Sequence, residues 1–402
     1  MSANPKVAGV DKIVDRWPKQ LWTGSMKLGQ EFDPRRNALN AWRLTLATGV
    51  ILWHSFGLTG RHVAFEPAHQ LLRDGWVDGF FAISGFLITS SWLSNPRLRN
   101  YFVARGLRIL PGLWVCLIIT AFVIAPIGVA VQGGPAAKLL LSRAPIEYVL
   151  KNSAVVTVQL DVGGTPRGIP FPGVWNGSLW TLLWEVFCYI GVAGLGVVGL
   201  LSRRWPIPAA LALALSWSAL LPAWSFSLIE DPTLRQRHID GATVALVIEG
   251  VAARFAVMFL AGALLYQFRN VIPARWSLVA VSVVIVLAAG LLPNYRLVGA
   301  IPLAYAIIVS GALIHNKRLR LRTDLSYGVY IYAFPIQQLL VICGLGSMNP
   351  IVFATIAAIA TLPLAALSWI LIEKPAMSLK SRLKRRSIAP AGERPSGQTV
   401  SG

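Results

Sequence analysis

The chain has 402 residues, of which 55% are hydrophobic and only 13% are charged. This composition, with a mean hydropathy of +0.60, excludes an ordinary soluble protein. The formal net charge of +20 is compatible with nucleic-acid binding or with a membrane protein rich in Lys and Arg on its cytoplasmic side. Apolar runs of about 18–27 residues, separated by short basic clusters, favour the multi-pass membrane protein, and we expect no nucleic-acid partner.

Ten apolar stretches are predicted to be membrane-spanning helices of an all-α integral membrane protein. Of the 37 Lys and Arg residues, 26 fall on the inner side if the N-terminus is cytoplasmic, 9 fall on the outer side, and two lie within spans. This excess inside supports cytoplasmic N- and C-termini. The spans cover residues 38–58, 76–94, 109–131, 174–200, 206–227, 246–267, 275–293, 297–314, 325–345 and 350–372.

The chain is expected to contain one membrane domain flanked by two polar segments. Residues 1–37 are a polar, charged cytoplasmic or interfacial segment without the apolar core of a secretory signal. The membrane domain covers 38–373, and its one long external loop, 132–173, is rich in Gly and Pro and is a candidate lid or acceptor-binding loop. Residues 374–402 form a basic tail predicted to be disordered.

The first span carries two groups that a bilayer disfavours, Arg43 and His54. Eleven residues are about three helical turns, so both side chains should share one face, roughly 16 Å apart along the axis. Ionisable groups at membrane depth usually face a cavity or each other. The alternatives are an Arg43 that reaches the cytoplasmic interface and a His54 that packs inside the bundle.

The second span places Asp78 near its outer end, at the same expected depth as His54, so its carboxylate is a candidate to orient the imidazole. Ser84 and Gly85 form a small pair that lets helices approach closely. Farther along the chain, Arg105 and Arg108 are three residues apart and therefore neighbours on a helix face. Such a pair suits a phosphate-bearing ligand, the alternative being ordinary cytoplasmic charge.

Glu185 lies inside the otherwise apolar fourth span. It needs either a cationic partner, with Arg43 and Arg254 as the candidates, or a watery cavity. An ion pair that holds the bundle together and a catalytic role are both open. The remaining histidines are expected to be solvated, and the three cysteines lie in apolar spans without the spacing of a disulfide framework or a metal site: His62, His69, His238 and His315; Cys116, Cys188 and Cys343.

Six motifs in order along the chain resemble those of one known family. They begin with the Arg and His separated by ten residues in the first span. The others are Asp78-Gly-Phe-Phe-Ala-Ile-Ser-Gly-Phe, Phe102-Val-Ala-Arg-Gly-Leu-Arg-Ile-Leu-Pro, Ser178-Leu-Trp-Thr-Leu-Leu-Trp-Glu, Ser326-Tyr-Gly-Val-Tyr and Ser368-Trp-Ile-Leu-Ile-Glu-Lys-Pro. From about Asn40 to Lys380 the chain resembles the acyltransferase-3 family of integral membrane acyltransferases.

The resemblance implies transfer of an acyl group, expected to be acetyl, from cytoplasmic acyl-CoA to a hydroxyl of a cell-envelope glycan, lipid-linked sugar or glycolipid. It implies a protein of the bacterial plasma membrane with no tightly bound cofactor and no metal. His54 would be the general acid/base, with Arg43, Asp78 and Glu185 completing the catalytic set; a covalent acyl-enzyme on His54 or Ser84 stays open. The residues assigned to acyl-CoA binding are Arg105, Arg108, Ser84, Gly85 and Trp180.

The sequence departs from the family pattern at three positions. Gly106 stands where many members have a further Arg, Thr181 replaces a common Ser, and Ala333 replaces a His to which we therefore assign no role. The chain also lacks the appended esterase-like domain of some members. We therefore expect it to act alone or with a separate extracytoplasmic partner.

Two other functions compete with acyl transfer. In a transporter or flippase, Arg43, His54 and Glu185 would form an intramembrane polar relay. In a scaffold of a polysaccharide-export complex, His54 would be dispensable. The sequence does not identify the acceptor or the length of the acyl chain.

Overall fold

The computed structural model describes residues 26–226, 240–321 and 323–379. The regular secondary structure of these ranges is helical, which confirms the predicted all-α class, and only two isolated bridges join extended residues. The predicted interfacial segment before Met26, His238 and the tail beyond Leu379 lie outside the described residues.

Helices occupy all ten predicted ranges. Five stretches are long and apolar enough to cross a membrane: Pro67–Ser94, Leu98–Val131, Gly241–Gln267, Arg296–Leu313 and Pro350–Leu379. The count of ten spans and the cytoplasmic position of the termini stay predictions. The helices are α3 (Leu39–Leu58), α4 (Glu66–Ser94), α5 (Leu98–Ile119) continued by η2 (Thr120–Ile124) and α6 (Ala125–Val131), α9 (Thr181–Val197), α10 (Pro206–Leu220), α11 (Gly241–Gln267), α12 (Trp276–Ala289), α13 (Arg296–Leu313), α14 (Ser326–Ile342) and α15 (Pro350–Ser368) continued by η8 (Trp369–Glu373).

The outer surface of the bundle is strongly apolar. Leu213, Val284, Ile359 and Leu371 are each more than half exposed, on four different helical segments. Exposed apolar side chains on this scale are typical of a surface that contacts lipid rather than water. The fold is therefore that of a helical membrane protein.

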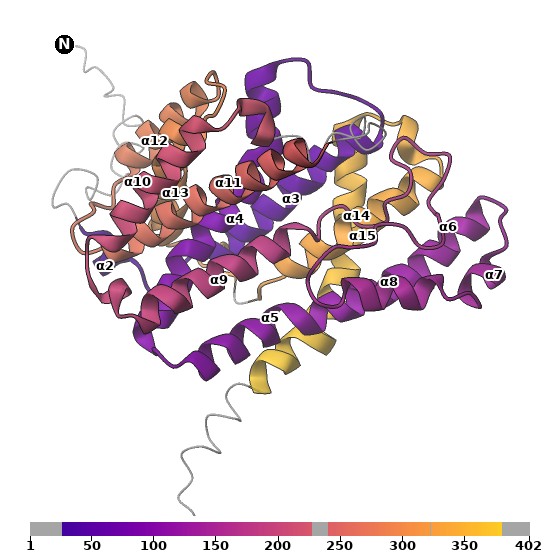
Figure 1. Ribbon diagram of the computed structural model, residues 1–402, viewed down its shortest axis with the longest axis horizontal. Helices are drawn as coiled ribbons and strands as arrows, with labels where there is room; N and C mark the ends of the chain where they lie inside the picture. Colours follow the sequence, from indigo (N-terminus) through magenta and orange to yellow (C-terminus); the bar gives the residue numbers. More distant parts are fainter. Residues whose placement is uncertain (1–25, 227–239, 322, 380–402) are drawn as a thin grey trace, which may run out of the picture.

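Two helices, α4 and α11, form the centre of the bundle and pack closely along their length (Figure 1). The cause is a pair of facing glycines. A Cβ atom on Gly85 of α4 would lie 1.9 Å from the carbonyl oxygen of Phe259, and one on Gly262 of α11 would lie 1.9 Å from that of Ala82. The predicted role of the small pair in helix packing is thus confirmed for Gly85, whereas Ser84 faces elsewhere.

The remaining helices are arranged around this pair. α3 packs against α4, α14 and α15, and α9 packs against α4. Figure 1 shows α10, α12 and α13 on one side of the centre, and the short helices of the 132–173 region on the other. Those short helices are α7 (Ala136–Leu140) and α8 (Ala144–Asn152); smaller helical turns are α2 (Leu28–Glu31), η3 (Leu200–Ser202), η4 (Ala223–Phe226) and η7 (Leu345–Ser347).

The fourth predicted span begins later than expected. Residues 174–180 are not helical, and α9 starts at Thr181. Backbone groups in a membrane protein need partners when they leave a helix. Gln338 of α14 donates to the carbonyl of Val174 at 2.6 Å, and Asn176 donates to the carbonyl of Ile331 at 2.8 Å. These amide side chains hold the non-helical segment that leads into α9.

Candidate active site

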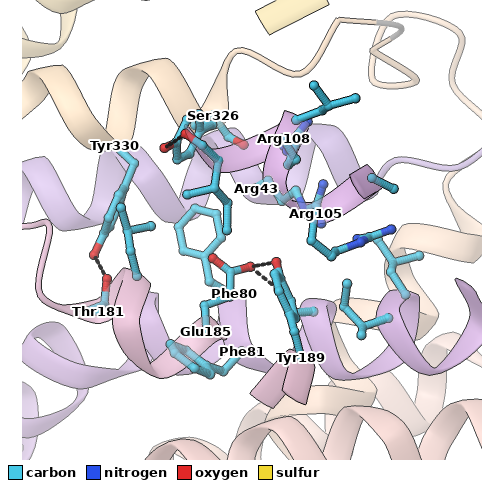
Figure 2. A pocket seen from close by; sticks show the side chains of 18 of the residues that line it. Arg43, Phe80, Phe81, Arg105, Arg108, Thr181, Glu185, Tyr189, Ser326 and Tyr330 are labelled. Carbon is cyan, nitrogen blue, oxygen red and sulfur yellow. Dashed lines mark hydrogen bonds between the residues drawn. The ribbon is translucent and has the colours of Figure 1, made fainter. Parts of the chain in front are cut away.

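Two adjacent cavities lie between α3, α4, α9 and α14. The larger has a volume of about 370 Å³ and is lined by residues of these helices and of α5 (Figure 2). The smaller, of about 10 Å³, lies beside His54. Val77, Thr181 and Tyr330 line both cavities and therefore form the wall between them. Arg43 and His54 thus both face this interior region, as their eleven-residue spacing predicts.

One side of the larger cavity carries three arginines, from α3 and α5 (Figure 2). Arg43 and Arg108 both contact Asp324, which precedes α14: their guanidinium nitrogens lie 2.9 Å and 2.5 Å from the same carboxylate oxygen. Burial alone would raise the pKa of Asp324, but the guanidinium groups of Arg108 and Arg43 hold it well below its usual value. Asp324 is therefore ionised and fixes the two arginines in place.

Arg105 is held differently from its neighbour. It donates to the hydroxyl of Ser91 at 3.2 Å, and its guanidinium carbon lies 5.8 Å from the ring centres of both Tyr101 and Tyr189. No ion pair to Arg105 is present within the described ranges. Its positive charge is thus available to a ligand in the cavity.

Glu185 projects into the larger cavity from α9. One of its oxygens accepts hydrogen bonds from Ser84, at 3.1 Å, and from the hydroxyl of Tyr189. The sequence leaves open whether Glu185 has a cationic partner or faces a cavity, and the structure shows that it faces a cavity. The two candidate partners pair elsewhere: Arg43 with Asp324, and Arg254 with two carboxylates of α4. The charged residues that line this cavity, among those the structure describes, are three arginines and the carboxylate of Glu185.

His54 lines the smaller cavity together with the aromatic residues Trp53 and Trp180 and with Arg73. Its ring packs edge-to-face against Phe334, with ring centres 4.9 Å apart. In the part of the chain that the structure describes, His54 Nδ1 is buried without a hydrogen-bond partner. No ion pair joins the imidazole to a carboxylate among the described residues, and the ring borders the smaller cavity.

The predicted pairing of Asp78 with His54 is wrong. Asp78 accepts from Arg254 Nε at 2.8 Å and from Arg296 Nε at 2.6 Å, and the hydroxyl of Tyr295 also donates to it. Guanidinium groups stay charged and bind carboxylates through several donors, so they outcompete a titratable imidazole for a buried carboxylate. Asp78 is a structural ion-pairing residue in this arrangement.

A second buried carboxylate belongs to the same cluster. Asp74, one turn before Asp78, lies 3.0 Å from Arg254 Nη1 and 2.6 Å from Arg296 Nη2. It also accepts from Arg73 Nε at 3.0 Å. The ion cluster (Arg73, Asp74, Asp78, Arg254 and Arg296) therefore links α4 to α11 and α13, and Arg73 extends it to the edge of the His54 cavity.

The structure separates the residues assigned to acyl-CoA binding. Arg105, Arg108 and Ser84 line the larger cavity. Trp180 lines the smaller one and packs against Phe255. Gly85 lies in the α4–α11 contact, because a backbone without a Cβ atom is what that contact requires. The two candidate acyl carriers, His54 and Ser84, line different cavities.

Several residues of this region were not singled out from the sequence. Asp324 is the only acidic residue of the basic 315–324 segment, a signal that was available. Tyr330 ends the Ser326-Tyr-Gly-Val-Tyr motif, but nothing in the motif indicates its contact with Thr181. Arg73 was expected in an external segment and instead lies in α4.

Comparison with known proteins identifies the family of the chain. Residues 36–370 match the acyltransferase-3 family, described as "acyltransferase domain". The chain belongs to this family. It is 27% identical to "nodulation protein 10" of Rhizobium leguminosarum bv. viciae over 78% of this chain and 84% of that protein. It is 26% identical to the "O-acetyl transferase" of Shigella phage Sf6 over 85% of this chain and 96% of that protein. No solved structure matches the chain.

Family membership confirms the resemblance seen in the motifs. The protein is a helical membrane acyltransferase, and its two cavities are the candidate active site.

Proposed function

We propose that this acyltransferase moves an acetyl group from acyl-CoA, bound from the cytoplasmic side of a bacterial plasma membrane, to a hydroxyl of a cell-envelope glycan, lipid-linked sugar or glycolipid. One observation carries the proposal: an arginine-lined cavity meets the His54 cavity across a wall of three residues. A relative named as an O-acetyl transferase, covered over 96% of its length, supports acetyl transfer to oxygen.

The larger cavity suits an anionic donor with a long, mostly apolar arm. Arg105 carries no ion pair among the described residues, and Arg43 and Arg108 share a single carboxylate. Such guanidinium groups suit the phosphates of coenzyme A. Between the arginines and the wall, Phe80, Leu87 and Ile88 offer an apolar surface. In this reading the arm follows that surface towards the wall and brings the thioester near His54.

The proposed reaction uses His54 as the general base. Neutral His54 removes the proton of the acceptor hydroxyl while the oxygen attacks the thioester carbonyl, a C–O bond forms and the C–S bond breaks. The proton then passes from His54 to the departing sulfur, so that the products are an ester and the free thiol of coenzyme A. General acid–base catalysis of this kind accelerates a reaction by about 10²–10⁴.

The test compares membranes that contain the wild type, His54→Ala or Arg43→Ala, each supplied with radiolabelled acetyl-CoA. Label in the glycan and lipid fractions measures transfer, and immunoblotting and size-exclusion chromatography verify expression and folding. We expect His54→Ala to lose transfer by at least about 10²-fold. His315→Ala, which removes an exposed histidine, is the matched control and should retain wild-type transfer.

Two results would contradict the proposal. Transfer by folded His54→Ala at the wild-type rate would remove the catalytic assignment. Absence of transfer by the wild type with acetyl-CoA and with longer acyl donors would favour the transporter or flippase, in which Arg43, His54 and Glu185 form a relay.

A further inference from the structure

The wall between the two cavities is closed by a hydrogen-bonded pair of hydroxyls. Thr181 Oγ1 at the start of α9 and the hydroxyl of Tyr330 on α14 are 2.6 Å apart. Figure 2 shows this pair across the pocket from the three arginines. Both hydroxyls also contact the carbonyl oxygen of Ser178, Tyr330 at 3.0 Å and Thr181 at 3.2 Å. Val77 of α4 completes the wall.

The hydrogen bonds fix the position of the Thr181 methyl group. A threonine side chain has one torsion, so a held hydroxyl leaves the methyl a single orientation. Thr181 is buried, and it lines both cavities. Its methyl is therefore a rigid part of the wall and does not swing aside without breaking the contact with Tyr330.

The two sides of the wall differ greatly in size. The arginine-lined cavity has about 370 Å³, whereas the His54 cavity has about 10 Å³, space for roughly one water molecule. A thioester that approaches His54 from the larger cavity must carry its acyl group past Val77, Thr181 and Tyr330. An acyl group is larger than one water molecule, so the wall has to give way even for acetyl, and each additional methylene requires a larger displacement.

We propose that this wall restricts the transferred group to acetyl and that Thr181 is its specificity-determining residue. The proposal rests on the proposed function, because it takes the larger cavity as the donor site and His54 as the reacting side. Under this proposal, the replacement of the family's common serine by Thr181 changes the wall. Serine has the same hydroxyl but lacks the methyl group. Specificity here depends on one methyl group.

The experiment measures kcat/KM for labelled acetyl-, propionyl- and butyryl-CoA in membranes that contain wild type, Thr181→Ser or Val77→Ala, with the label followed into the glycan and lipid fractions. Thr181→Ser keeps the hydroxyl that bonds Tyr330 and removes only the methyl. We expect wild type to prefer acetyl-CoA and Thr181→Ser to lower the acetyl-to-propionyl ratio by about tenfold, since one methylene in a pocket is worth 10–200-fold in discrimination. Val77→Ala opens the same wall from α4 and should lower the ratio in the same direction.

The matched control is Thr361→Ser. Thr361 is a fully buried threonine of α15 whose hydroxyl donates to the carbonyl of Ala357 at 2.7 Å. Removing its methyl deletes the same group at a site outside the two cavities, so the ratio should stay at the wild-type value.

The outcomes separate the two proposals. A wild type that transfers all three acyl groups equally well, or a Thr181→Ser ratio equal to wild type, would overturn the wall proposal and leave acyl transfer standing. A ratio that falls as much in Thr361→Ser as in Thr181→Ser would also overturn it, because the effect would then be general loosening. No transfer by the wild type with any donor would overturn the proposed function, and the wall proposal with it.

Discussion

The carboxylate of Asp324 contacts both Arg43 and Arg108, so its removal leaves the two guanidinium groups without the oxygen that they share. We expect Asp324→Asn to lower the free energy of unfolding by about 2 kcal/mol, between the ~1 kcal/mol of an exposed pair and the 3–5 kcal/mol of a fully buried one. Thermal unfolding in detergent at neutral pH measures this loss. Glu147→Gln, which breaks the exposed pair with Lys151, is the control and should change the melting temperature little.

The ion pairs of Asp324 should also make the stability of the fold depend on pH. The pKa of Asp324 is lowered in the folded protein because Arg108 and Arg43 outweigh the effect of burial. A lowered carboxyl pKa stabilises the fold fully above the ordinary value of roughly 4, and this contribution is lost as the pH falls towards the folded pKa. The difference in melting temperature between wild type and Asp324→Asn should therefore narrow below about pH 4. A constant difference between pH 7 and pH 3 would contradict the ion pairing.

At this scale the sequence was informative about which residues matter and less so about what each one contacts. The spacing of Arg43 and His54 indicated a shared face because helical geometry is regular. The partner of Asp78 was missed because depth alone does not say which neighbour is closer. Arg254 is 176 residues away in the chain, and only the packing of α4 on α11 brings the two together.

At the scale of helices, the contact between α4 and α11 depends on two glycines. Gly85→Ala or Gly262→Ala would put a methyl 1.9 Å from a backbone carbonyl oxygen of the other helix, so the two helices would have to separate. We expect each variant to lose most of its folded yield in detergent, measured as the monodisperse fraction on size-exclusion chromatography. Gly194→Ala in α9 has no atom within 4 Å of the new Cβ and should retain or gain stability, because alanine favours the helix. Equal yields for all three variants would contradict the close contact.

The sequence predicts where the helices lie better than it predicts where each helix begins and ends. Each of the ten predicted apolar stretches contains a helix, because long apolar runs favour helices inside a membrane protein. The first turns of α4 were predicted as an external segment, since they include His69, Gln70, Arg73 and Asp74. Asp74 is buried within this helix because Arg254 and Arg296 supply partners for its carboxylate. Tertiary partners of this kind leave no local trace in the sequence.

For the whole molecule, the predicted orientation decides which side delivers the donor. Lys138 in α7 and Lys317 between α13 and α14 are both exposed. In a background without the native cysteines, a membrane-impermeant maleimide should label Lys138→Cys in intact cells and should label Lys317→Cys only after lysis. The reverse pattern would place the arginine-lined cavity on the outer side and exclude cytoplasmic acyl-CoA as its ligand.

The ion cluster also has a consequence for biosynthesis. The ribosome completes α4 long before α11 and α13, so Asp74 and Asp78 reach the membrane before Arg254 and Arg296 exist. An unpaired carboxylate within a membrane helix is costly, and Arg73 is the one guanidinium of the cluster made alongside them. The N-terminal part of α4 therefore gains its full set of partners only after the later helices have been inserted. The ion cluster is complete only once synthesis has passed Arg296.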